Sequence, residues 1–291
     1  MVPSSLRATS PVIGTFCVMA AAMCFGSIPL FSRMTFADGL TPASVTFMRY
    51  FLPALLLCFL LPPLLADRTT AFRTFLVGIA IAIGTYGYAV GIRDLDVAIA
   101  AIIFFSFPLF VSLYKLILLR LRPTQSEIIT LSLITLAVAL VAGPIDPDKV
   151  SLASVLTTFL GPAAYGAVLV TFSTQKQDLP ALSLSAALCL GGLLGSIAIM
   201  LVFDGSLILP SSTNGWIGVI GLSIIATLAP NAFLAIGAGA AGPVRSAIGG
   251  TFELPVSLSL GWFVLMEPIE LNQIAGASII LGSLIVNILK R

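Results

Sequence analysis

Histidine is absent from the 291-residue sequence, and charged residues make up only 9% of it. Soluble domains carry about 25% charged residues, so this fraction excludes an ordinary soluble protein. The four cysteines, Cys17, Cys24, Cys58 and Cys189, lie in apolar stretches and lack the spacing of metal ligands. We therefore expect them to be packing residues, and we expect no disulfide, metal or other cofactor.

Long runs of Lys or Arg are also missing, and the formal net charge is only +2, so nothing in the sequence favours a nucleic-acid partner. Hydrophobic residues instead reach 58%, with a mean hydropathy of +1.12. Charges and Pro/Gly clusters divide the chain into ten apolar segments of about 20 residues, the length that crosses a bilayer. We expect an all-α integral membrane protein with ten transmembrane helices, near 11–32, 42–65, 72–92, 97–119, 125–143, 151–173, 181–203, 214–236, 241–266 and 270–289.

The loops between these segments differ in charge. With ten spans both termini lie on one side, and that side holds most of the Lys and Arg residues, whereas the other holds most of the Asp and Glu residues. The positive-inside rule then predicts that both termini are cytoplasmic. The first apolar segment follows Arg7, as the apolar core of a signal peptide follows a basic residue. No soluble domain comes after it, so we interpret it as the first span.

The two halves of the sequence repeat each other weakly. Pairing residue n with residue n+147 places Pro108 on Pro255 and Ser112 on Ser259 without a gap. We therefore expect one compact membrane domain built of two five-helix repeats, 1–147 and 148–291. An odd number of spans in each repeat inverts the second repeat relative to the first, which is typical of transporters.

Two blocks of the sequence resemble the two repeats of the EamA-like family of the drug/metabolite transporter superfamily: CFGSIPLFSRMTFADGLTPASVTFMRYFLPALLL and PVRSAIGGTFELPVSLSLGWFVLMEPIELNQIAGASIILGSLIV. Phe25 replaces the tryptophan that the family usually has before the Gly26–Ser27 pair. Arg120 stands where the first repeat usually ends in an acid, and Glu267 keeps that acid in the second. Within the superfamily the chain looks most like bacterial exporters of amino acids, including aromatic ones, which implies export across a bacterial-type inner membrane.

Helix-breaking residues point to a binding site near the bilayer midplane. Pro108 and Pro255 each remove an amide donor and bend their helix, and interrupted helices at matching points of inverted repeats are typical of transporter sites. Gly249 and Gly250 share a small, polar helix face with Glu253 and so join the prolines as candidate gating residues. Kinks that serve packing alone are the alternative interpretation.

Glu253 is the acidic residue placed deepest in a span. It is a candidate for binding a substrate ammonium or a coupling proton, or it pairs with a neighbouring group for structural reasons. Arg49 could attract a carboxylate or extend to the outer interface. The other candidate substrate-binding residues are polar or aromatic groups close to the midplane: Ser257, Ser106, Phe104, Tyr86, Asn231 and Tyr165.

Together with the resemblance, these features predict a secondary transporter that exports small metabolites by alternating access around a midplane cavity. The substrates that we expect first are amino acids with aromatic or other apolar side chains. No nucleotide-binding motif is present, so a substrate or proton gradient must drive the transport. Export of amphipathic or cationic drugs is the closest alternative. An intramembrane enzyme would need a nucleophile beside a base, and a channel would need a selectivity filter. The sequence shows neither feature, so we expect neither function. The lipid bilayer is the expected environment, protons are a candidate partner, and the uniformly apolar spans 5 and 10 could support a homodimer.

Overall fold

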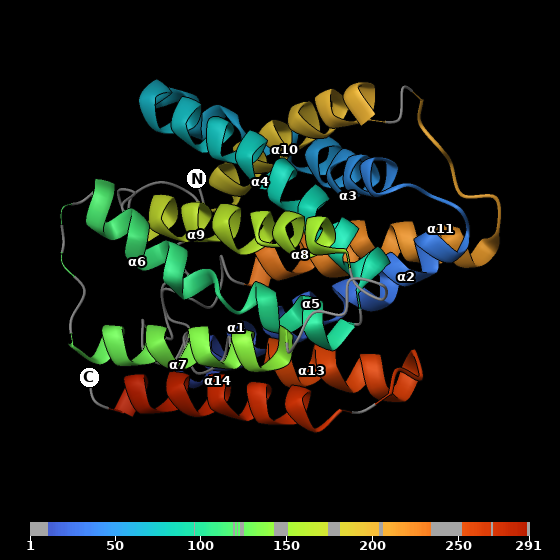
Figure 1. Cartoon of the computed structure of the whole chain (residues 1–291). Coiled ribbons are helices and arrows are strands. Elements are labelled where there is room, and N and C mark those ends of the chain that lie inside the picture. Colours follow the sequence, from blue (N-terminus) through green and yellow to red (C-terminus); the bar gives the residue numbers. More distant parts are fainter. Residues whose placement is uncertain are drawn as a thin grey trace.

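The computed structural model describes residues 11–95, 97–118, 120, 122, 125–142, 151–173, 181–203, 206–233, 252–268 and 270–289. Within these ranges every regular element is a helix, and most helices run between the same two ends of a bundle (Figure 1). The N-terminal half (residues 11–142) and the C-terminal half (151–289) each contribute helices to the interior.

The described part of the N-terminal half consists of seven α-helices and two short 3₁₀ turns. They are α1 (Pro11–Gly26), α2 (Ile28–Ala37), α3 (Pro42–Leu57), η2 (Cys58–Leu60), η3 (Pro62–Ala66), α4 (Arg68–Asp94), α5 (Val97–Phe104), α6 (Phe107–Leu118) and α7 (Gln125–Ala142). Two pairs, α1 with α2 and α5 with α6, are each divided by only one or two residues. Each such pair therefore occupies one predicted span.

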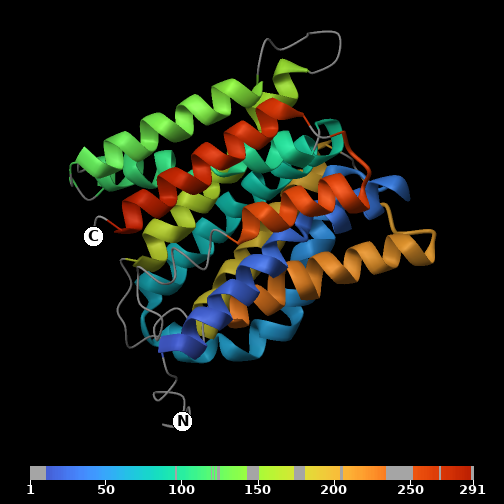
Figure 2. The same ribbon diagram turned by 90° about the horizontal axis from the view of Figure 1, so that it is seen from below.

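The C-terminal half contains two π-helical segments. Its elements are α8 (Leu152–Thr158), α9 (Leu160–Ser173), α10 (Ala181–Phe203), α11 (Thr213–Ile220), the π-helical η4 (Gly221–Leu228), α13 (Glu253–Ser259), the π-helical η5 (Leu260–Val264) and α14 (Leu271–Leu289). The start of α1 and the end of α14 lie toward the same end of the bundle (Figure 2).

Every predicted span contains helix, and the bounds of α10 agree with its predicted range. Six described helices are long and apolar enough to cross a membrane: Val12–Ala37, Pro42–Leu60, Arg68–Asp94, Ile99–Ile117, Leu182–Phe203 and Thr213–Phe233. These helices support a multi-pass membrane protein. The count of ten spans and the inversion of the second half stay predictions.

The interruptions in the helices have local causes. The lack of an N–H on Pro108 deprives the Phe104 carbonyl of its helical partner, and α5 ends at Phe104 while α6 begins at Phe107. In the first span the break falls at Ser27, whose hydroxyl donates to the Cys24 carbonyl at 2.6 Å. Pro255 lies in the first turn of α13, where N–H groups have no intrahelical acceptor. Gly249 and Gly250 lie outside the described residues.

Helices α4 and α10 cross at glycines. A side chain at Gly191 would lie 2.9 Å from Cα of Gly78 and would collide with the carbonyl of Phe75, and Gly195 approaches Ala82 in the same way. The two backbones therefore touch without side chains between them, as small residues allow in membrane helices. This crossing joins the two halves of the chain.

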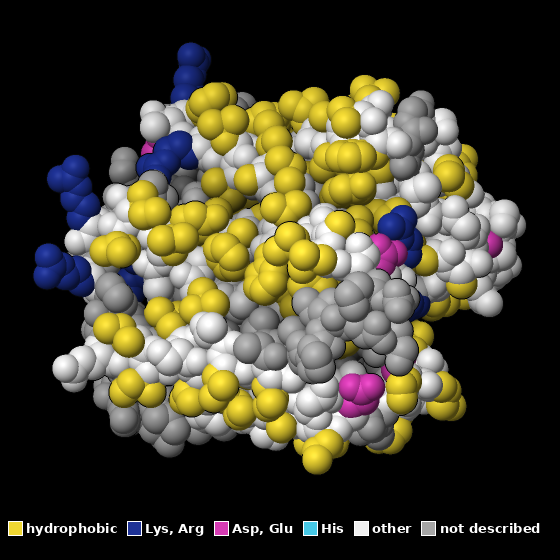
Figure 3. Space-filling model, in the orientation of Figure 1, with side chains coloured by type: hydrophobic (Ala, Val, Ile, Leu, Met, Phe, Trp, Pro, Cys, Tyr) yellow, Lys and Arg dark blue, Asp and Glu magenta, His cyan; other side chains and the backbone are white. Residues whose placement is uncertain are grey.

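Helices α7 and α14 pack side by side at the edge of the bundle (Figures 1 and 2). The face in Figure 3 carries a broad band of apolar side chains, with most of its Lys and Arg residues at one end and most of its Asp and Glu residues at the other. This distribution suits a bundle with its middle in lipid and its ends in water.

Polar contacts join the two halves near the ends of α2 and α4. Nη2 of Arg33 donates to Oε1 of Glu267 at 3.1 Å and to the Leu95 carbonyl at 2.6 Å. The hydroxyl of Ser154 donates to Asp94 at 2.7 Å. Both contacts lie where the sequence places the outer loops. We call the contacts of Arg33 with Glu267 and of Asp94 with Ser154 the outer bridges.

Asp38 makes a further contact between the halves on the same side. Its carboxylate accepts hydrogen bonds from the backbone N–H groups of Ser211 at 2.7 Å and Ser212 at 3.2 Å, just before α11. Hydrogen bonding, first from the Ser212 side chain and then from these N–H groups and the Ser211 hydroxyl, lowers the pKa of Asp38 to about 2. The ionised carboxylate therefore ties α2 to the start of α11 at neutral pH.

Candidate functional site

A cavity of about 90 Å³ lies in the centre of the bundle. Side chains from both halves line it, and they come from α1, α2, α3, α4 and α5 on one hand and from α9, α10, η4 and α13 on the other. Neither α7 nor α14 is among the elements that line it. Both helices therefore lie away from this hollow.

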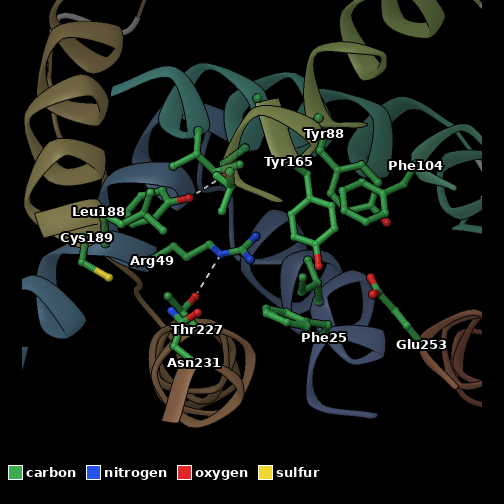
Figure 4. A pocket seen from close by; sticks show the side chains of 17 residues that line it. Phe25, Arg49, Tyr88, Phe104, Tyr165, Leu188, Cys189, Thr227, Asn231 and Glu253 are labelled. Atoms are coloured by element: carbon green, nitrogen blue, oxygen red, sulfur yellow. Dashed lines mark hydrogen bonds between the residues drawn. The ribbon is translucent and has the colours of Figure 1, made fainter. Parts of the chain in front are cut away.

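Arg49 is the cation in this cavity. It lies in the middle of α3, and hydrogen bonds to η4 hold it on one side: Nε donates to Oγ1 of Thr227 at 3.0 Å, and Nη2 donates to the Ala226 carbonyl at 3.4 Å. Figure 4 shows the guanidinium reaching into the cavity from α3. Because the side chain turns inward, it does not extend to the outer interface.

Glu253 is the carboxylic acid in the cavity. It is the first residue of α13, and its carboxyl group enters from the wall opposite Arg49, with the Tyr165 side chain between the two (Figure 4). The residue is half-buried because its side chain borders the hollow rather than packed atoms. Gly26, the last residue of α1, makes room for this end of α13, since a side chain there would lie 2.9 Å from the Glu253 carbonyl.

Aromatic rings form the wall beside Glu253. The ring of Phe104 lies 5.0 Å from that of Tyr88 and 5.3 Å from that of Tyr165, measured between centroids. Tyr165 also contacts Phe107 edge to face at 5.2 Å. Phe25, at the end of α1, lines the cavity from below in Figure 4. The wall thus offers a flat apolar surface next to an acid.

Five of the eight predicted substrate-binding residues line the cavity: Glu253, Arg49, Phe104, Tyr165 and Asn231. These five residues come from different helical segments. In the sequence they are separated by as many as about two hundred residues. The structure brings them together around one hollow. Their role in binding a substrate is not tested by this placement and is proposed below.

The other three predicted residues do not line the cavity. Ser257 is buried and donates to the Gly26 carbonyl at 3.1 Å, so it joins α13 to the break in the first span. Ser106 is fully buried in the break between α5 and α6. Tyr86 stacks on Phe203 of α10 at 4.9 Å. For Ser257 and Tyr86 the rotation of the helix turns the side chain toward a neighbouring helix.

Several lining residues were not among the predicted set. Tyr88, two residues after Tyr86, is one of them. Residues 81, 84, 85 and 88 all line the cavity and share one helical face, and this spacing could have identified Tyr88. Phe25, Tyr50, Thr85, Cys189 and Thr227 also line the cavity, but the sequence gives no signal that separates them from packing residues.

The groups around the cavity are suited to binding a ligand. Among the described residues, no group of three Cys, Asp or Glu side chains could hold a metal ion. The hydroxyl of Tyr50 is hydrogen-bonded to that of Thr85 at 2.7 Å, and this bond stabilises the wall of the cavity. A guanidinium, a carboxyl group and aromatic rings around a hollow can hold a ligand that has polar groups and an apolar body.

Residues 12–143 match the model of the EamA-like transporter family. The match covers α1 to α7, and it identifies a domain of this family within the drug/metabolite transporter superfamily. Members of an EamA-like transporter family move small molecules across membranes, in agreement with the apolar helices. No protein among the curated sequences matches the chain.

One solved structure resembles the chain over nearly its whole length. Eighteen chains match, and one of them, titled "Crystal structure of protein", superimposes with a TM-score of 0.63 at 15% sequence identity. The alignment covers 95% of this chain and 98% of that chain. At this identity the likeness shows the fold alone. The alignment extends beyond α7. The shared fold therefore includes the C-terminal half of the chain, which the family model does not match.

Proposed function

We propose that the protein is a secondary transporter that exports amino acids with apolar or aromatic side chains. The observation that carries this proposal is that Arg49 and Glu253 face one aromatic cavity from opposite walls (Figure 4). An amino acid has a carboxylate for the guanidinium, an ammonium for the carboxylate and a side chain for the rings. Each group of the ligand therefore finds a complementary group in the cavity.

Cationic drugs, the alternative substrates, fit the cavity less well. A ligand with positive charge alone leaves Arg49 without a counter-charge and places a second cation near it in a medium of low dielectric constant. The cavity volume of about 90 Å³ is also well below the range of about 300–1,000 Å³ that holds drug-sized ligands. Even an amino acid with a large side chain requires the walls to separate, which fits a site that changes shape during transport.

The packing of the helices supports two inverted repeats and alternating access. Two inverted repeats predict that each span can be exchanged with the span five positions away without changing the pattern of contacts. Under this exchange the pair α4–α10 corresponds to η4–α3. The pair α4–α9 corresponds to α11–α2, and the pair α6–α9 corresponds to α13–α1. All six pairs are in contact, and the pairs α7–α14, α3–α10 and α5–α13 convert into themselves. Two halves related in this way can rock about the cavity and expose it to each side in turn.

The outer bridges support the proposal that the outer side is closed in this state. They join the halves at the end where the sequence has an excess of acidic loops, and the positive-inside rule assigns that end to the outside of the cell. In this state the cavity is therefore shielded from the outside. We propose that the bridges separate when the transporter releases its substrate outward.

The driving force is a gradient of the substrate itself or of protons. Glu253 is the group in the cavity that can carry a proton when it turns from one side of the membrane to the other. Exchange of an outgoing amino acid for an incoming proton at Glu253 is one form of the proposal. Downhill export without a coupled ion is the other form.

Transport in proteoliposomes tests the proposal. Vesicles containing the protein should take up labelled phenylalanine and leucine with saturation, and phenylalanine amide, which lacks the carboxylate, should compete poorly. The same vesicles with an imposed pH gradient distinguish the two driving forces. Saturable uptake of organic cations together with no uptake of any amino acid would contradict the proposed substrate class.

A further inference from the structure

Three hydrogen bonds hold α3 against η4 around Arg49. The hydroxyl of Ser223 donates to the carbonyl of Met48 at 2.9 Å, and the bonds from Arg49 to Thr227 and Ala226 follow on the next turn. Ser223 and Thr227 are both buried in the described structure. The contact therefore fixes both the backbone and the side chain of α3 at the level of the cavity.

The hydroxyl of Thr227 is oriented by its own helix. It donates to the carbonyl of Leu222 at 2.8 Å, five residues earlier, which follows from the wider turn of a π-helix. With its hydrogen directed to Leu222, the oxygen presents a lone pair to Nε of Arg49. The π-helical turn thus supplies a fixed acceptor for one edge of the guanidinium.

The opposite edge of the guanidinium faces the cavity. A guanidinium has five N–H donors, and the bonds to Thr227 and Ala226 account for Nε and for one donor on Nη2. Among the described residues, no acceptor is bonded to Nη1. Figure 4 shows this edge directed toward the space beside Tyr165. The free edge has the parallel donors that bind a carboxylate at both oxygens.

We infer that Thr227 is a positioning residue that makes the site selective for ligands with a carboxylate. It acts through Arg49, which would contact the substrate, and the inference rests on the proposed function. By fixing the Nε edge, the hydroxyl keeps the Nη1–Nη2 edge aligned with the ligand before the ligand arrives. Such an arrangement lowers the entropy that the side chain loses on binding.

Replacement of Thr227 by valine tests the inference, because valine keeps the shape and removes the hydroxyl. Loss of a hydrogen bond to a charged group corresponds to about a tenfold change in affinity. Thr227→Val should therefore raise KM for phenylalanine about tenfold while kcat stays near the value of the unmodified protein. Thr227→Ser, which restores a hydroxyl, should return KM to within about twofold.

The matched control is Thr158→Val. Thr158 is also buried, and its hydroxyl donates to the Ser154 carbonyl of its own helix at 2.6 Å, without contact with Arg49. This control should leave KM unchanged. A rise in KM with Thr158→Val equal to that with Thr227→Val would contradict a specific role for Thr227.

A second background separates positioning from general stability. In Arg49→Gln protein, adding Thr227→Val should change KM no further, because the group through which Thr227 acts is gone. Uptake of phenylalanine amide should likewise respond little to Thr227→Val. Equal effects on the acid and the amide, or a full effect in the Arg49→Gln background, would overturn the inference.

The same measurements distinguish a failure of the inference from a failure of the proposed function. If the unmodified protein transports amino acids and Thr227→Val keeps its KM, the inference alone is wrong. If the unmodified protein transports no carboxylate-bearing amino acid, the proposed function is wrong and the inference is overturned with it.

Discussion

At the scale of single residues, the two charged groups of the cavity are placed where they can bind opposite charges on one small molecule. Arg49 reaches the hollow from α3, and Glu253 reaches it from the start of α13. An ion in the interior of a membrane protein is costly without compensation, so such residues usually serve binding or proton transfer. Under the proposed function, their opposition across a row of aromatic rings sets the orientation in which an amino acid would bind.

The first prediction concerns Glu253→Gln, which keeps the size of the side chain and removes its charge. Amino-acid transport should fall about tenfold, because the substrate ammonium loses a charged acceptor. Any dependence of transport on a proton gradient should disappear. The measurement is uptake of labelled phenylalanine by proteoliposomes over a range of pH.

Glu270→Gln provides the control, since Glu270 is exposed beyond the end of η5. This variant should keep both the rate and the pH profile. Full transport with an unchanged pH profile in Glu253→Gln would show that Glu253 neither binds the substrate nor carries a coupling proton.

The second prediction concerns Asp38, whose hydrogen bonds lower its pKa to about 2. An unfolded Asp has a pKa of about 3.9, so the stabilisation is fully present above pH 4 and is lost as the pH falls toward 2. Asp38→Asn should lower the thermal midpoint in detergent at pH 6 relative to the unmodified protein. The difference between the two proteins should shrink below pH 4, and a constant difference down to pH 2 would contradict the pKa assignment.

At the scale of elements, the sequence predicts where helices lie much better than which way they face. Apolar length and loop charges locate a segment because lipid tolerates few polar groups. The break at α5 and α6 was likewise predictable, because Pro108 removes a donor wherever the helix is rotated.

Helix rotation is decided by packing, and for this reason the candidate site was predicted only in part. Tyr86 and Tyr88 have the same chemistry and nearly the same depth, yet the stack of Tyr86 on Phe203 and the glycine face of α4 turn Tyr88 to the cavity. Thr227 could not be predicted, because no sequence pattern marks the π-helical turn that directs its hydroxyl to Arg49. Ionisable residues were easier to predict, since their cost in lipid restricts where they can point.

The third prediction concerns the crossing of α4 and α10. Gly191→Val would place a side chain against the backbone of Phe75 and Gly78, and overpacking of this kind costs about 1–3 kcal/mol or more. The thermal midpoint in detergent should fall clearly. Gly282→Ala is the control, because a methyl group there meets no atom within 4 Å, and this variant should be neutral or slightly more stable. Equal midpoints for the two variants would show that the crossing is loose.

At the scale of the whole molecule, the two halves are held together differently along the bundle. Apolar and glycine contacts join them near the cavity, whereas the ion pair and hydrogen bonds of the outer bridges join them at one end. Ion pairs near water are weak and can be broken at little cost. The end that carries these contacts is therefore suited to open and close.

The fourth prediction uses Cys189, which lines the cavity, as a reporter in a protein whose other cysteines are replaced by serine. Arg33→Glu should place two acids together and raise the rate at which a membrane-impermeant thiol reagent labels Cys189 from the outside, several-fold for a pair of about 1 kcal/mol. The double variant Arg33→Glu with Glu267→Arg should restore part of the protection. Complete restoration is not expected, because Arg33 also donates to the Leu95 carbonyl.

Labelling that stays at the level of the unmodified protein in Arg33→Glu would show that the bridge does not control access. Faster labelling from the inner side would instead show that the bridge lies on the opposite face of the membrane from the one proposed.

The crossing at Gly78 and Gly191 determines what kind of motion the molecule can make. Two backbones in direct contact have no side chains that could rearrange between them, so α4 and α10 cannot slide along one another without losing that contact. They can still tilt about it. The glycine contact then acts as a pivot, and a small rotation of one half of the chain at this point becomes a larger displacement at the far ends of the helices.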